Sequence, residues 1–202
     1  MPVSVRALGH RFGDAWLFRD VSFSVPQQGS VAVVGPSGSG KSTLLRILAG
    51  TLAPTEGSVE IPPTTRISLV HQTPHGVGPR TVIDHIALPW WARGADLTTG
   101  WHEAERIAAT LGLDGALHRP FSEMSGGEAQ RIRLAVAMAE QPDLILADEP
   151  TASLDAGNAM SVVASLRRVT DLGATLVVAT HDPRVADACG QAVRLSGPSG
   201  DG

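Results

Sequence analysis

The segment Gly35-Pro-Ser-Gly-Ser-Gly-Lys-Ser42 decides how this chain folds. It fits the pattern G-x-x-x-x-G-K-[ST], follows the apolar, β-branched run Ser30 to Val34, and leads into a helical stretch, Ser42 to Ala49. A strand, a glycine-rich loop and a helix in this order predict backbone N–H groups arranged around phosphate oxygens. Lys41 would reach the β- and γ-phosphates, and Ser42 would give an oxygen to Mg²⁺. The segment therefore predicts a site for a polyphosphate nucleotide.

An acidic pair follows a second apolar strand further along the chain. Leu144 to Ala147 is a continuous apolar run, typical of a parallel strand covered on both faces, and Asp148 and Glu149 follow it. Asp148 would hold Mg²⁺ directly or through water, because this hard cation prefers carboxylates, phosphates and water. Glu149 would orient and deprotonate the attacking water. Two carboxylates at a strand end are often only solvated, but beside a phosphate-binding loop they predict a Walker B motif.

The segment Met124-Ser-Gly-Gly-Glu128 opens a long predicted helix, Gly126 to Ala139. Ser125 followed three residues later by Glu128 forms a capping box, which gives the segment a purely structural interpretation. A capping box needs no double glycine, whereas exposed N–H groups at a helix start make a second phosphate site. The segment resembles the signature motif of the ABC ATPase family, with Met124 for the usual leucine and Glu128 where glutamine is common.

Three further residues follow the order of motifs in that family. Gln72 comes after the predicted strand Ile67 to Val70 and resembles the Q-loop glutamine, which senses Mg²⁺ and the membrane partner. Asp155 ends a Ser-Leu-Asp tripeptide that resembles the D-loop. His181 follows the predicted strand Thr175 to Ala179 and resembles the switch histidine that contacts the γ-phosphate. A lone glutamine or histidine is usually structural, so these interpretations depend on the order of all the motifs.

The resemblance runs from about Val3 to Leu195 and implies a Mg²⁺-dependent ATPase. Its catalytic residues would be Lys41, Glu149 and His181, and its metal-binding residues Ser42, Gln72 and Asp148. Its nucleotide-binding residues would be Phe12, Gly35, Pro36, Ser37, Gly38, Ser39, Gly40, Lys41, Ser42, Thr43, Gln72, Ser125, Gly126, Gly127 and Asp155.

The aromatic ring that stacks on adenine is the least determined of these residues. The family usually places a tyrosine there, and this chain has none. Phe12 stands in the best-matching position, with Trp16 and Phe18 as competitors, since stacking needs only a π-face. A core role for Phe12 is the alternative interpretation.

The family also implies a shared active site. Each motif occurs once here, whereas the signature serine of one nucleotide-binding domain faces the nucleotide on the P-loop of another. We therefore expect two copies to close head to tail on two ATP molecules, and membrane-spanning subunits to receive the motion through the helical region and Gln72. Thr81 to Pro89 resembles subunits of lipoprotein-release and macrolide-export systems. The transported substrate, the direction of transport and the choice of homodimer or heterodimer stay open.

The order of elements predicts an α/β fold. We expect a P-loop NTPase core with a parallel sheet, an antiparallel β subdomain that begins with strands Val3 to Leu8 and Val21 to Val25, and an inserted helical subdomain. The insert would contain helices at Val82 to Ala92, Trp101 to Leu111 and Gly126 to Ala139, with loops at Gly94 to Gly100 and Gly112 to Pro120. One domain results, with core residues 1–73 and 141–195, a helical subdomain at 74–140 and a loose tail at 196–202.

Composition sets limits on partners and location. The chain has 202 residues, 43% of them hydrophobic, and a formal net charge of −4 without a dense basic cluster, so a nucleic-acid partner is not expected. The single cysteine, Cys189, has no intrachain partner, which favours the reducing cytoplasm. No apolar run approaches the roughly 18 residues of a membrane-spanning helix. We therefore expect a cytoplasmic protein, peripheral on the inner face of the plasma membrane.

Two other classes of protein remain as alternatives. A soluble ABC ATPase without a transport role, for example in iron–sulfur assembly, shares every motif named above. DNA-repair and chromosome types need long insertions between the Walker motifs, and the translation type needs two tandem copies, which this chain does not have. A P-loop kinase or GTPase would have neither the signature serine nor the switch histidine. The motifs favour the transporter ATPase.

Overall fold

Five parallel strands form the larger of two sheets in the computed structural model, which describes residues 3–71 and 76–196. Their order across the sheet is β5-β6-β7-β3-β8, and every neighbouring pair is parallel. The strands are β3 (Ser30–Val34), β5 (Ile67–Val70), β6 (Leu144–Asp148), β7 (Thr175–Thr180) and β8 (Gln191–Arg194). Their carboxyl ends therefore lie along one edge, which is where ligands bind in open α/β sheets.

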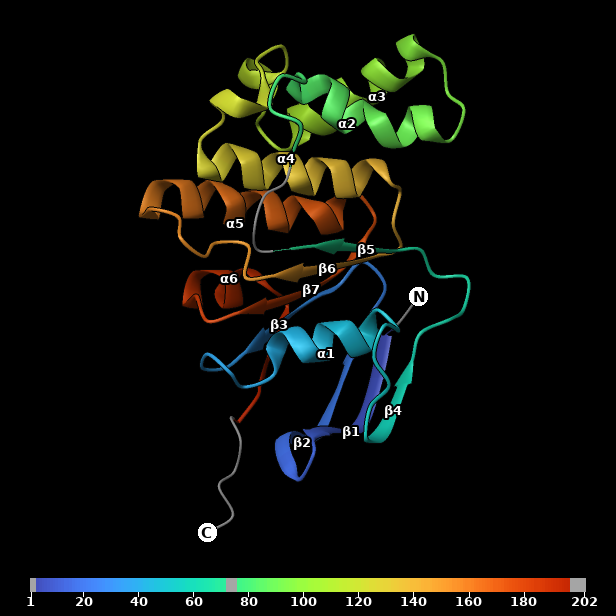
Figure 1. Cartoon of the computed structure of the whole chain (residues 1–202), viewed down its shortest axis with the longest axis vertical. Coiled ribbons are helices and arrows are strands. Elements are labelled where there is room, and N and C mark those ends of the chain that lie inside the picture. The colour runs from blue at the N-terminus through green and yellow to red at the C-terminus, as the bar shows by residue number, and fades with distance from the viewer. Residues whose placement is uncertain (1–2, 72–75, 197–202) are drawn as a thin grey trace.

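Both faces of this sheet are buried. Ile145 and Ala147 of β6 pack into one hydrophobic core on one face of the sheet. Leu144 and Leu146 pack into a second core on the other face, together with α1 (Lys41–Leu48). Figure 1 shows α1 on one side of the sheet and α4 (Gly126–Ala139) and α5 (Ala156–Asp171) on the other. A strand that is covered on both faces needs apolar side chains at every position, which explains the continuous apolar runs of β6 and β7.

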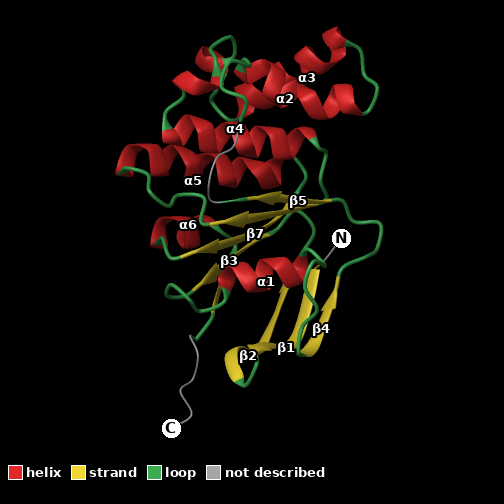
Figure 2. Ribbon diagram, viewed as in Figure 1, coloured by secondary structure: helices red, strands yellow, loops and turns green. Residues whose placement is uncertain are grey.

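The smaller sheet is antiparallel, with the order β2-β1-β4, and packs beside α1 (Figure 2). Its strands are β1 (Val3–Phe12), β2 (Ala15–Val25) and β4 (Glu56–Glu60). β1 and β2 are longer than the alternation predicted and meet at the expected turn, where Gly13 has a positive φ of 59°. Shifts of register between β1 and β2 interrupt the alternation, which is why only parts of these strands were recognisable in the sequence.

The helical region between β5 and β6 contains α2 (Val82–Ala92), α3 (Leu97–Thr110), two short 3₁₀ turns (Asp114–Ala116 and Phe121–Glu123) and α4. The predicted loop at Gly94 to Gly100 is wrong, because α3 already begins at Leu97. Asp96 caps this helix and accepts hydrogen bonds from the backbone N–H and the hydroxyl of Thr99, at 2.9 and 2.8 Å.

The boundaries of the helical subdomain at 74 and 140 stay a prediction. α4 contacts α2 and α3 on one side and α5 on the other, so it joins the helical layer to the core. No helix within residues 3–71 and 76–196 is long and apolar enough to cross a membrane.

Two elements near the end of the described chain escaped prediction. The helix α6 (Pro183–Ala188) spans only six residues, and β8 is an edge strand whose residues are mostly exposed, so neither has a strong hydrophobic period. The cap Asp182 and the proline that follows it were the available signal for α6. Of the predicted tail 196–202, all residues beyond 196 lie outside the described part of the chain.

Candidate functional site

The glycine-rich loop connects the end of β3 to the start of α1. Gly40 has a φ of 95°, and a Cβ placed there would lie 2.7 Å from side-chain atoms of both Leu17 and Phe18. A Cβ at Gly35 would lie 2.5 Å from the Ser39 hydroxyl oxygen. Glycine is therefore required at position 40 by both backbone conformation and space, and at position 35 by space.

The N-terminus of α1 offers positive potential to a ligand. Gly40 occupies the N-cap position and has no side chain to cap the helix, and the first turn from Lys41 holds no acidic residue. The first N–H groups of a helix have no partners inside the helix, and the helix dipole adds positive potential beside them. This helix start can therefore bind phosphate oxygens.

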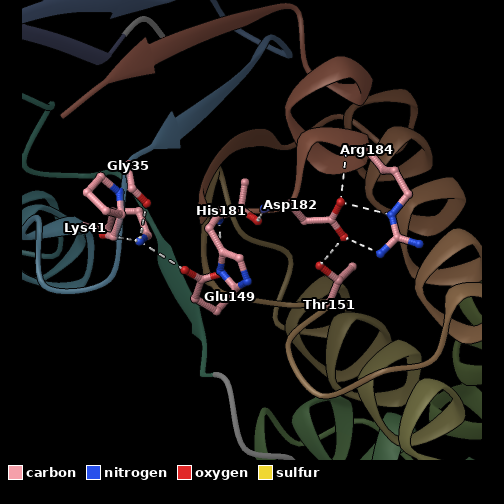
Figure 3. A network of polar contacts seen from close by, with 9 residues as sticks. Gly35, Lys41, Glu149, Thr151, His181, Asp182 and Arg184 are labelled. Atoms are coloured by element: carbon pink, nitrogen blue, oxygen red, sulfur yellow. Dashed lines mark hydrogen bonds and ion pairs between the residues drawn. The ribbon is translucent and has the colours of Figure 1, made fainter. Parts of the chain in front are cut away.

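Lys41 points its ammonium group back along the loop. Its side chain is only 7% exposed, and Nζ donates to the carbonyl oxygens of Gly35 and Pro36 at 2.9 and 3.1 Å. Nζ also forms an ion pair with Oε1 of Glu149 at 3.2 Å. Figure 3 shows this chain of contacts continuing from Lys41 through Glu149 to His181. The structure thus brings the three predicted catalytic residues together.

Glu149 joins the end of β6 to the end of β7. Its backbone N–H donates to the carbonyl of Ala179 at 2.8 Å, and its Oε2 lies 2.9 Å from Nδ1 of His181. This contact uses the Nδ1 side of the imidazole ring and leaves Nε2 for another partner. Glu149 has a positive φ of 46°, an uncommon conformation for a residue with a side chain. Such conformations often mark functional sites.

Asp148 has the properties of a metal ligand. It ends β6, and its Oδ1 is buried without a hydrogen-bond partner among the described residues. A buried carboxylate oxygen without a partner is costly unless a cation or water satisfies it. Ser42, the other predicted Mg²⁺ ligand that the structure describes, is exposed in the first turn of α1. Gln72 lies outside the described residues.

The predicted capping box is present at the start of α4. Ser125 accepts from the backbone N–H of Glu128 at 3.2 Å, and Glu128 Oε2 accepts from the backbone N–H of Ser125 at 2.8 Å. This second hydrogen bond, with help from nearby Arg119, lowers the pKa of the Glu128 carboxyl. Ser125 and Gly126 are nevertheless exposed, so the same helix start can still meet a ligand.

Comparison with known proteins identifies the family. The ABC transporter family matches residues 18–152, which is more than half of the chain. The chain belongs to this family. The match begins in β2 and ends just after Glu149, so it includes both the loop at Lys41 and the α4 segment.

Relatives of this ABC protein include ATP-binding subunits of several systems. The lipoprotein-releasing system ATP-binding protein LolD of Blochmanniella floridana is 35% identical over 185 residues, covering 84% of this chain and 79% of that protein. A probable anion import ATP-binding protein of Haloferax volcanii is 33% identical over 210 residues, covering 91% of this chain and 73% of that protein.

Solved structures of one bacterial ABC transporter cassette are also similar. Its dimeric structure aligns with a TM-score of 0.78 at 26% identity, covering 96% of this chain and 94% of the cassette. A dimeric post-hydrolysis state of the same cassette, bound to ADP and Pi, gives the same TM-score and coverage at 28% identity. The protein is an ATP-binding and ATP-hydrolysing subunit of an ABC transporter.

The segment at the start of α4 and the cap Asp155 of α5 are linked through Asn158. A Cβ at Gly127 would lie 2.5 Å from Oδ1 of Asn158, so α4 and α5 approach closely at this glycine. Asn158 also donates its backbone N–H to Oδ1 of Asp155 at 2.9 Å, and this hydrogen bond lowers the pKa of the Asp155 carboxyl. Sequence reasoning missed Asn158, for which the only signal was its place three residues after the cap Asp155.

The three candidate aromatic residues differ in what surrounds them. Phe18 is 4% exposed and belongs to the core, so its ring is enclosed by protein. Trp16 lies beneath the guanidinium groups of Arg11 and Arg19, whose carbon atoms are 5.6 and 4.2 Å from its ring centre. Phe12 is 56% exposed. Exposure therefore favours Phe12 for stacking on a base.

Proposed function

We propose that ATP binds along the carboxyl edge of the larger sheet, with each residue in the role its motif implies. The observation that carries this proposal is the convergence of Lys41, Glu149 and His181, three residues from separate segments, in one chain of contacts within 3.2 Å. Lys41 and backbone N–H groups within the loop at 35–43, Pro36 excepted, would hold the phosphates. Phe12 would stack on the adenine, since its ring is exposed.

Mg²⁺ is the expected cofactor of this site. Ser42 and Asp148 would hold it, with Gln72 as a third ligand, and the unpartnered Oδ1 of Asp148 supports the assignment. When bound, Mg²⁺ neutralises charge on the phosphate oxygens.

Hydrolysis would depend on Glu149 as the general base. Its carboxylate orients the attacking water and takes its proton, a role that contributes about 10²–10⁴-fold in rate. His181 holds that carboxylate through Nδ1 and keeps Nε2 for the γ-phosphate. Both residues follow strands of a sheet that is buried on both faces, so their backbone is held rigidly.

A second copy of this chain would complete each site. α1, which follows the P-loop, and α4, which carries Ser125, lie on opposite faces of the sheet (Figure 1). Within the described residues, no hydrogen bond joins Ser125 to the loop at 35–43. In a head-to-tail homodimer, Ser125, Gly126 and Gly127 of one copy would cover the γ-phosphate of ATP on the other, and Asp155 would lie at the same interface.

This subunit would lie at the inner face of the plasma membrane, where its helical region at 74–140 would bind the membrane-spanning partners. The printed names of relatives include a lipoprotein-releasing system and an anion import protein, so they point to transport without selecting one substrate or one direction. No observation favours the alternative of a soluble ABC ATPase without a transport role.

A mixing experiment tests the shared site. Lys41→Ala and Ser125→Arg are each expected to be inactive alone, because both sites of either homodimer then contain a lesion. A mixed dimer contains one intact site, formed by the P-loop of the Ser125→Arg chain and the signature of the Lys41→Ala chain. ATPase activity should therefore partly return on mixing. No recovery in mixtures or in tandem fusions, while the wild-type fusion is active, would contradict the shared site; so would full activity of Ser125→Arg alone.

A further inference from the structure

A buried carboxylate lies between the two loops that carry Glu149 and His181. Asp182 is 8% exposed and follows His181 directly, while Thr151 is 6% exposed and follows Glu149 by two residues. The hydroxyl of Thr151 donates to Oδ2 of Asp182 at 2.9 Å, which ties the loop after β6 to the loop after β7 (Figure 3). Neither residue belongs to the motifs considered so far.

The hydrogen bonds of Asp182 hold its carboxylate in one orientation. Oδ1 accepts from the backbone N–H and Nε of Arg184 at 3.0 and 2.9 Å. Oδ2 accepts from Nη2 of Arg184 at 2.8 Å as well as from Thr151. These bonds, above all those from the Arg184 side chain, lower the pKa of the Asp182 carboxyl, so it is ionised at neutral pH. A bidentate arginine of this kind adds geometric specificity to the attraction.

The helix cap explains only part of this arrangement. As the N-cap of α6, Asp182 needs to accept only from the backbone N–H of Arg184. The hydrogen bond from Thr151 does not contribute to this cap, because it joins Asp182 to a residue 31 positions earlier in the chain. The backbone N–H of Asp182 is also held, by the hydroxyl of Thr180 at 3.0 Å. The Asp182 end of the Thr151–Asp182 bond is therefore fixed in place.

This bond acts at the place where the backbone needs support. Glu149 has a φ of 46°, and strained conformations of this kind persist only where surrounding contacts hold them. The loop is held at Glu149 by the hydrogen bond from its N–H to Ala179 and by its contact with His181. The loop is held again at Thr151 by the bond to Asp182. The backbone from 149 to 151 therefore lies between two fixed points.

We propose that Thr151 and Asp182 are positioning residues that set Glu149 and His181 in register for ATP hydrolysis. This proposal rests on the proposed roles of Glu149 and His181. Thr151 and Asp182 act through the backbone of the two loops, and Arg184 keeps the Asp182 carboxylate oriented toward Thr151. A displacement of about 1 Å in a catalytic group can cost on the order of 10²-fold in rate.

The first test removes only the hydroxyl of Thr151. Thr151→Val keeps nearly the same shape, and we expect kcat to fall about tenfold or more, within the ~10²-fold of a 1 Å displacement, with little change in KM or ATP affinity. Thr151→Ser restores the hydroxyl and should restore kcat. Asp182→Asn, which replaces one accepting oxygen with a donor, should reproduce the kcat effect and provides a second variant if Thr151→Val is unstable.

Thr175→Val is the matched control. Thr175 is 2% exposed at the start of β7, opposite the end near His181, and its hydroxyl accepts from the backbone N–H of Gln28 at 3.1 Å. Like Thr151→Val, this substitution removes one buried hydrogen bond between segments, so both should lower the Tm. Thr175→Val should leave kcat unchanged. Equal losses of kcat in Thr175→Val and Thr151→Val would overturn the proposal, because loss of stability alone would then explain both.

A double-mutant comparison separates this proposal from the proposed function. In single-turnover assays, Thr151→Val should slow the Glu149→Gln variant by a smaller factor than it slows the wild type, because the base that it positions is gone. Equal factors in both backgrounds would show that Thr151 acts independently of Glu149 and would reject the positioning role. Near-normal turnover of Glu149→Gln alone would instead reject the proposed base, whatever Thr151→Val does.

Discussion

Replacing Gly40 with alanine tests whether the P-loop conformation depends on this residue in the way the structure indicates. Gly40 has a φ of 95°, and a Cβ there would lie 2.7 Å from atoms of Leu17 and Phe18. The left-handed conformation costs a residue with a Cβ about 1–2 kcal/mol. Forcing a methyl group into packed side chains costs about 1–3 kcal/mol more. Gly40→Ala should therefore lower the free energy of unfolding by about 2–5 kcal/mol.

Two other glycines separate these contributions. Gly38 and Gly50 have positive φ values of 79° and 70°, but a Cβ at either position meets nothing within 4 Å. Gly38→Ala and Gly50→Ala should each lower the free energy of unfolding by only the conformational cost of about 1–2 kcal/mol. Gly50 lies beyond the far end of α1, so Gly50→Ala should keep wild-type ATP affinity, while the substitutions in the loop should weaken it.

The assay is urea denaturation of each purified variant, together with titration of a fluorescent ATP analogue. The expected order of stability is wild type, then Gly38→Ala and Gly50→Ala at similar values, then Gly40→Ala. If Gly40→Ala were as stable as Gly38→Ala, the result would contradict the close packing of Leu17 and Phe18 against Gly40. If Gly50→Ala weakened ATP binding as much as the loop variants, the effect would not report on a phosphate site.

Three further predictions concern individual side chains. Glu149→Gln should still bind ATP but hydrolyse it about 10²–10⁴-fold more slowly, with an ATP-bound dimer accumulating on a sizing column; near-normal turnover would reject the base. Phe12→Ala should weaken ATP binding more than Trp16→Ala in an equilibrium titration, and the reverse order would assign the stacking ring to Trp16. Because the pKa of Asp182 is lowered from 3.8, its ionised form stabilises the fold above that pH and the contribution is lost as pH falls through the folded-state pKa. Asp182→Asn should therefore show a shallower loss of unfolding free energy below about pH 4 than the wild type, and identical slopes would contradict the assignment.

Much of the fold was readable because its signals are local. The bounds of β3, β5, α2 and α4 match the predicted segments. The strand β3 is an apolar run that stops before Gly35, and α2 and α4 begin directly after the caps Thr81 and Ser125. The beginning of α3 was misplaced because Asp96 was not recognised as its cap. The helix α6 and strand β8 are short and weakly patterned, so local signals could not reveal them.

The candidate site was predicted in its chemistry but not in its supporting contacts. Lys41 was identifiable from the glycine-rich loop before it, and Asp148 and Glu149 from their place at the end of an apolar strand. Thr151, Asp182 and Asn158 carried no such pattern, since a threonine or an asparagine beside a motif has many ordinary roles. Their contacts became visible only in the structure.

The sequence by itself determined the conformations that depend on neighbouring residues. The loop at 35–42 turns because Gly38 and Gly40 permit positive φ. The helix α4 begins after Ser125 because this serine and Glu128, three residues later, satisfy each other's N–H groups. Only the tertiary structure decided which of these segments meet. Placing β7 between β6 and β3 brings His181 beside Glu149, and burying both faces of that sheet puts α1 and α4 on opposite sides. Such pairings depend on how the whole apolar surface is covered, which no local pattern of residues specifies.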